Sequence, residues 1–87
     1  MKKIKIRGHF WKIKDESDLE VGLLGLCDYD NKTLNIPYEG DTKEELGTII
    51  HESLHAIYPD LNEEAIQDGE DALTNILWKL KWRKSFD

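Results

Sequence analysis

The stretch His51-Glu52-Ser53-Leu54-His55 decides how this chain of 87 residues is interpreted. Two histidines four residues apart lie on the same face of an α-helix, so both imidazoles can point at one metal ion. Glu52 falls beside that face, close to the ion without binding it. Imidazole suits zinc, and a zinc ion with an open coordination position lowers the pKa of its bound water to about 7. A carboxylate beside that water can pass its proton to a leaving amine, so the stretch predicts a peptide-hydrolysing centre.

The residues around this motif predict a helix over Thr42 to Ile57. The helix opens with a capping box, in which Thr42 is the N-cap and Glu45 reaches back to it. Gly47 lies one turn before His51, where it lowers helix stability and leaves room for a strand or a ligand. Five aliphatic side chains recur at helical spacing and predict a buried stripe. They are Leu46, Ile49, Ile50, Leu54 and Ile57.

A second helix is predicted after Pro59, which disfavours helical backbone at the residue before it. Asn62 can cap this helix, and the two glutamates that follow suit the positive end of the helix dipole. The basic stretch 79–84 suits its C-terminal end. Its predicted apolar stripe consists of Ile66, Leu73, Ile76, Leu77 and Leu80.

The N-terminal part of the chain predicts short strands. Residues 3–7 alternate Lys and Ile, which is typical of a half-buried strand, and a second short strand follows at 10–13. A strand near 23–29 and another over 33–36 flank an Asp-Asn-Lys turn and predict a β-hairpin. Cys27 is predicted to be a small core residue and not a metal ligand, because no other ligand residue stands at a suitable spacing.

Length and composition limit the class of protein. A chain of 87 residues predicts one domain, 1–87, with a thin core. The net charge of −6 argues against a nucleic-acid partner, because phosphates repel acidic surfaces. The basic start lacks the apolar segment of a signal peptide, and no apolar run is long enough to span a membrane. The single cysteine fits a reducing compartment, so we expect a cytoplasmic protein with no membrane partner.

The motif, followed by an acidic second helix, resembles the zincin metallopeptidases and, among them, a very short gluzincin. It is also similar to small metallopeptidase-like proteins encoded by phages and bacteria. The resemblance implies an α+β, zincin-like fold, in which a small antiparallel or mixed β-sheet packs on the motif helix and a second, C-terminal helix. It further implies one Zn²⁺ ion bound by His51, His55 and a glutamate of the next helix, with a peptide or protein as substrate.

Two registers are open for this glutamate. Gluzincins carry Asn-Glu-x-x-x-Asp after the motif, and the matching region here, 62–68, is one residue too long. Keeping Glu-x-x-x-Asp selects Glu64 as the ligand, with Asp68 as the carboxylate that orients a metal-binding imidazole. Keeping Asn-Glu selects Glu63, which helical rotation also favours because it lies nearer the apolar stripe. The supporting carboxylate decides our prediction in favour of Glu64.

The sequence allows two functions. The first is zinc-dependent hydrolysis of peptide bonds with Glu52 as general base, and Tyr38 or Tyr58 is a candidate to stabilise the oxyanion. The alternative is a non-enzymatic, zinc-stabilised interaction or regulatory module, which the small size favours. Glu52 separates the two, because a structural zinc site is closed by protein ligands and needs no free carboxylate beside it. A third interpretation of the motif is a helix with two histidines and no metal.

Overall fold

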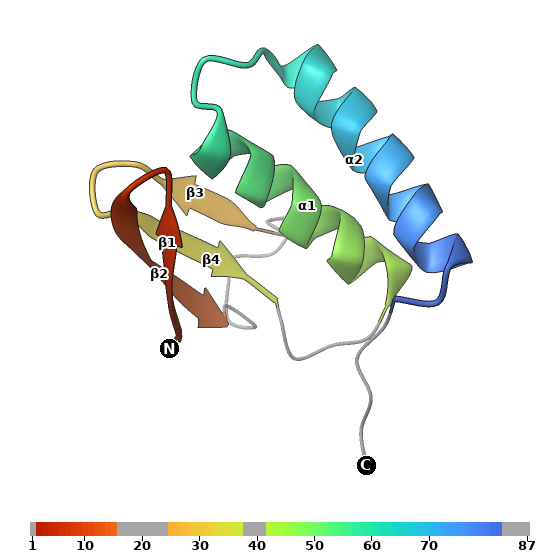
Figure 1. Ribbon diagram of the computed structural model, residues 1–87, viewed down its shortest axis with the longest axis horizontal. Helices are drawn as coiled ribbons and strands as arrows, with labels where there is room; N and C mark the ends of the chain where they lie inside the picture. Colours follow the sequence, from red (N-terminus) through yellow and green to blue (C-terminus); the bar gives the residue numbers. More distant parts are fainter. Residues whose placement is uncertain (1, 16–24, 38–41, 83–87) are drawn as a thin grey trace.

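The computed structural model describes residues 2–15, 25–37 and 42–82. These residues form a four-stranded sheet followed by two helices (Figure 1). The elements are β1 (Lys2–Ile6), β2 (His9–Asp15), β3 (Leu26–Asp28), β4 (Thr33–Ile36), α1 (Lys43–Ile57) and α2 (Glu63–Lys79). The chain is therefore α+β, as predicted, and its strands precede its helices.

The sheet is mixed, with the strand order β1-β2-β4-β3. Strands β1 and β2 form an antiparallel hairpin, and β3 and β4 form the second hairpin that the sequence predicts. The two hairpins meet through parallel pairing of β2 with β4, in which Ile13 lies opposite Leu34. This order places β3 at an edge of the sheet, where it packs against α1.

Helix α1 lies between the sheet and α2 (Figure 1). Trp11, Leu34 and Ala56 form the buried cluster between the sheet and α1, and Ile13 and Cys27 pack against it. The helices approach each other closely at Gly69 of α2, where a Cβ atom would lie 2.9 Å from a methyl group of Leu54. The helix that carries the motif is therefore covered on two sides.

Both helices begin as predicted. The hydroxyl of Thr42 accepts a hydrogen bond from the backbone N–H of Glu45 at 3.1 Å, and the Asn62 side chain accepts one from Ala65 at 2.8 Å. The C-cap of helix α1 is Tyr58, whose backbone N–H donates to the carbonyl of Leu54. These caps use short polar side chains to satisfy backbone N–H groups that the helices leave free.

The prediction of which residues of α1 are buried is wrong in detail. The buried residues of this helix are Gly47, Thr48 and Ala56, and the five predicted aliphatic side chains are only half-buried. A helix packed against both a sheet and a second helix is buried along two lines, one for each neighbour. Small residues on those lines allow close approach, so size as well as hydrophobicity decides which positions become buried.

The stripe of α2 is also wrong in part. Ile66 is fully buried, as predicted, and Thr74 is buried although the prediction omitted it. Helix α2 packs mainly against α1, so it covers only a narrow face. Three residues of the predicted stripe are exposed instead of buried: Leu73 by 40%, Ile76 by 52% and Leu80 by 64%. Among the described residues, no helix has both the length and the apolar character that a membrane span requires.

Candidate metal centre

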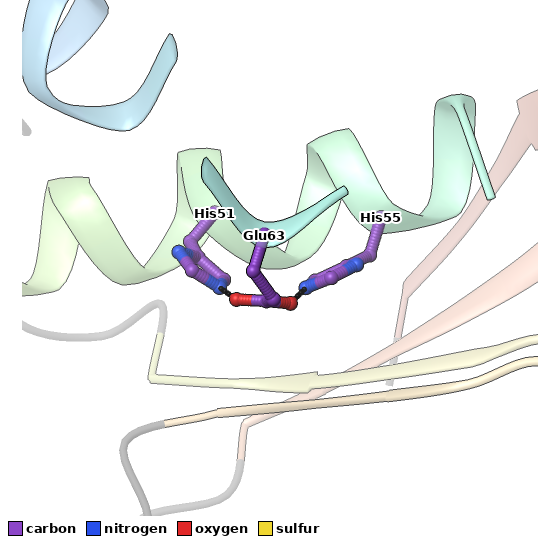
Figure 2. Close-up of side chains that lie close together, drawn as sticks. All are labelled: His51, His55 and Glu63. Carbon is purple, nitrogen blue, oxygen red and sulfur yellow. Dashed lines mark ion pairs between the residues drawn. The ribbon is translucent and has the colours of Figure 1, made fainter. Parts of the chain in front are cut away.

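His51 and His55 lie one turn apart on α1 and point their imidazoles at Glu63, the first residue of α2 (Figure 2). The Nε2 atom of His51 lies 3.5 Å from one carboxylate oxygen of Glu63, and Nε2 of His55 lies 2.7 Å from the other. One ligand atom from each of the three residues lies within 4.8 Å of the other two. The site therefore combines the helical spacing of the motif with a residue from the neighbouring helix.

This donor set fits zinc. Two ligand atoms bound about 2.1 Å from one tetrahedral ion lie about 3.4 Å apart, close to the His51–Glu63 distance. The two contacts use different oxygens of Glu63, and the three ligand atoms lie up to 4.8 Å apart, so the side chains have to shift to admit an ion. The side chain of Glu63 is 71% exposed and free to adjust, whereas the side chains of the two histidines are only 19 and 20% exposed. Three protein ligands leave one tetrahedral position open, as in catalytic zinc sites.

The structure brings Glu63 to the histidines and not Glu64, the ligand that we predicted. Successive helical residues are rotated by about 100°, so when Glu63 faces the histidines Glu64 faces away. Glu64 is exposed and does not belong to the group of described ligand atoms. The geometry therefore favours the Asn-Glu register, which helical rotation alone had selected.

The carboxylate that orients an imidazole is Glu70, in place of the predicted Asp68, which is exposed. An oxygen of Glu70 lies 2.7 Å from Nδ1 of His51. A carboxylate only accepts, so Nδ1 is the donor in this contact, and Nε2 is the ring nitrogen that would bind an ion. Gly47 provides the space, because a Cβ atom there would lie 3.0 Å from the other oxygen of Glu70.

The turn of α1 that carries His55 is held by a residue that the sequence analysis missed. The hydroxyl of Tyr29 donates a hydrogen bond to the backbone carbonyl of His55 at 3.0 Å. Burial raises the pKa of Tyr29 above its ordinary value of 10.0, and the nearby Cys27 and the carboxylates of Glu52 and Glu63 raise it further. No local pattern marks Tyr29, because its contact depends on how β3 lies against α1.

Of the two predicted oxyanion residues, the structure describes Tyr58 alone. Tyr58 is the C-cap of α1 and is exposed, and Tyr38 lies outside the described residues. Cys27 is half-buried and packs against the core, as predicted. Burial and the carboxylate of Glu52 raise the pKa of its thiol from 9.0 to about 11, which keeps the sulfur protonated. A protonated thiol is a poor zinc ligand, so the histidines and Glu63 are the better donors.

Glu52 lies one turn from Thr48 and one turn from Ala56 on α1, and its side chain lies next to Gly25, the residue that precedes β3. Its side chain borders a hollow of about 430 Å³ that is also lined by His51 and Gly25. Burial raises the pKa of the Glu52 carboxyl above its ordinary value of 4.5, and the neighbouring imidazoles oppose this shift. The structure thus places a half-buried carboxylate beside the histidines and next to an open space.

Comparisons with models of protein families, with curated protein sequences and with solved structures find no match to this chain. The functional argument therefore starts from the geometry of the site.

Proposed function

We propose that this protein is a zinc-dependent peptidase in which His51, His55 and Glu63 bind the ion and Glu52 is the general base. One observation carries the proposal: the two helices bring three ligand atoms within 4.8 Å of one another, with the carboxylate of Glu52 alongside. The donor set of two imidazoles and one carboxylate is typical of catalytic zinc sites. The proposed substrate is a peptide or a protein.

The residues divide the chemistry among them. Zinc would supply a Lewis acid that polarises the scissile carbonyl and acidifies a water molecule. Glu52 accepts the proton of that water and then donates it to the leaving amine. The raised pKa of Glu52 makes its carboxylate a stronger base for the first step than that of an ordinary glutamate. Glu70 holds the ring of His51 in the orientation that directs Nε2 at the metal position.

The same arrangement supports a zincin-like fold of the gluzincin type. The motif helix is followed by a helix that offers a glutamate ligand, and β3 forms the sheet edge next to the motif helix. The proposal is therefore a minimal gluzincin, similar to the small proteins encoded by phages and bacteria, acting in the cytoplasm.

The substitution Glu52→Gln tests the proposal. It removes the base but preserves the shape, so the variant should retain zinc and lose hydrolysis of a peptide library by roughly 100-fold or more. Glu44→Gln is a matched control, because Glu44 borders the same hollow two turns earlier on α1. Cleavage products are measured by mass spectrometry, and zinc by elemental analysis of the same samples.

Two outcomes would contradict catalysis by Glu52. Equal cleavage by the wild type and Glu52→Gln would remove this residue from the chemistry. Stoichiometric zinc without cleavage by either protein would favour the alternative, a zinc-stabilised interaction or regulatory module.

A further inference from the structure

The C-terminal end of α1 lies near the β1–β2 and β3–β4 turns (Figure 1). Residues of these three segments line a second hollow. Its volume is about 330 Å³, which is the lower end of the range for ligand sites. Trp11 and Tyr29 line it and contact each other edge to face, with ring centroids 6.3 Å apart. Ile6, Ile57 and Pro59 contribute further apolar surface. The floor of this hollow therefore suits an apolar group.

The rim of the same hollow is basic, although the whole chain carries a net charge of −6. Arg7, His9 and Lys32 line it, and none of its lining residues is acidic. The guanidinium of Arg7 donates one hydrogen bond to the carbonyl of Ile57 at 3.1 Å, which fixes it at the rim. A guanidinium has five N–H donors, and the described residues occupy one of them, so Arg7 can also donate to a ligand.

Two of these basic residues occupy turn positions with left-handed backbone, which asparagine or glycine adopts with less strain. Arg7 and Lys32 have φ angles of 49° and 47°, in the left-handed region. Arg7 and Gly8 form the two-residue turn between β1 and β2, where Asn or Gly is favoured. Both turns therefore carry a long cationic side chain at the edge of the hollow, where a smaller residue would suffice for the turn.

We propose that this hollow binds the carboxyl-terminal residue of a peptide whose last side chain is apolar. Arg7 and Lys32 offer charge-assisted hydrogen bonds to a carboxylate. The aromatic edge-to-face pair and the end of α1 offer the apolar surface for the side chain. A free inorganic anion would use the rim but leave the floor unfilled, so the terminal residue of a peptide matches the site better.

Tyr29 joins this hollow to the metal centre. Its ring lines the hollow, and its hydroxyl donates to the backbone carbonyl of His55. A residue bound in the hollow therefore lies next to the turn of α1 that carries a proposed zinc ligand. If the proposed peptidase activity holds, on which this step rests, the substrates are peptides with a free carboxyl terminus and an apolar last residue.

The test compares two probes that differ in charge. The ¹⁵N-labelled full chain, without zinc, is titrated with N-acetyl-L-leucine and with N-acetyl-L-leucinamide, and backbone shifts are followed at 6–11 and 29–32. The acid should bind about tenfold or more tightly than the amide. Arg7→Asn and Lys32→Asn should each weaken binding of the acid about tenfold, and asparagine suits both turns. Lys14→Asn, which removes an exposed charge at the far end of β2, is the matched control and should change nothing.

Equal affinity for acid and amide would overturn the proposal, and so would the absence of shifts with either probe. An equal loss in Lys14→Asn and Arg7→Asn would show a general charge effect and would also overturn it. The titration needs neither zinc nor hydrolysis. A failure of the zinc site therefore leaves this result intact, and a failure here leaves the zinc measurements intact.

Discussion

Helices α1 and α2 both contribute to the candidate metal centre, but they do so in different ways. Helix α1 supplies His51 and His55, whose relative position follows from helical spacing within five residues. Helix α2 supplies Glu63 and Glu70, whose positions depend on how the helix is rotated against its neighbour. A rotation of α2 by one residue would present Glu64 instead. The comparison shows that a ligand pair within one helix is predictable, whereas a ligand on a second helix depends on packing.

The two glutamates of α2 share one face for a simple reason. They are seven residues apart, which is close to two full turns, so both point toward α1. One faces both Nε2 atoms, and the other accepts from Nδ1 of His51. The predicted pair, Glu64 and Asp68, also shares one face of α2, but that face is turned away from the histidines.

The largest expected effect is on the contribution of α1. His51→Ala or His55→Ala should abolish stoichiometric zinc, because each removes one of the three ligand atoms that the site brings together. The melting temperature of the zinc-loaded protein should fall, since a metal bound only by the folded state stabilises it. His9→Ala, on β2, is the control and should retain about one zinc per chain by elemental analysis. Unchanged zinc in both motif variants would rule out the site.

The next largest expected effect is a difference in zinc affinity between variants of two neighbouring residues of α2. Glu63→Gln should weaken zinc affinity by more than about 100-fold, the upper end for residues that only orient a ligand. Glu64→Gln should leave it close to wild type, because this side chain faces solvent. Competition with a chromogenic chelator measures both affinities. A larger loss in Glu64→Gln would restore the register that the sequence pattern favoured.

A smaller effect is expected for the orienting carboxylate. Glu70→Gln should weaken zinc affinity by about 10–100-fold, because the amide no longer fixes Nδ1 of His51 as the donor. Asp68→Asn makes the same chemical change on the exposed face and should have little effect. If the two variants lose affinity equally, the contact between Glu70 and His51 does not orient the ligand.

The smallest effect reports on the face of α1 that turns toward the sheet. The reactive form of Cys27 is the thiolate, and burial together with Glu52 raises its pKa from 9.0 to about 11. Iodoacetamide should therefore react roughly 10–100-fold more slowly at pH 8 with the metal-free folded chain than with the chain unfolded in urea. Glu52→Gln removes one cause of the raised pKa, so iodoacetamide should react faster with Cys27 in this variant. The same rate in both states would contradict the raised pKa.

The sign of the matching pH effect on stability follows from the direction of this shift. Because the pKa of the Cys27 thiol is higher in the folded chain, folding favours the neutral thiol. This contribution to the free energy of unfolding is fully present below about pH 9. It is lost as the pH rises from 9 through about 11. Urea unfolding at pH 8 and pH 11, with Cys27→Ser as control, measures it.

The sequence alone determined the features that depend on residues close together in the chain. The caps at Thr42 and Asn62, the end of α1 before Pro59 and the spacing of the motif histidines all follow from local geometry. The pairing of β3 with β4 also followed, because a short polar turn joins two strands of matching pattern.

Only the tertiary structure decided the parallel pairing of β2 with β4, the choice of Glu63, and the contacts of Glu70 and Tyr29. Each joins residues from different elements, so each depends on the relative rotation and distance of two surfaces. The rotation and the distance are set by close packing at small residues such as Gly47 and Gly69. The sequence pattern of a single helix or strand does not predict this packing. The motif thus indicated where a metal could bind, and the packing of α2 on α1 decided which residues complete the site.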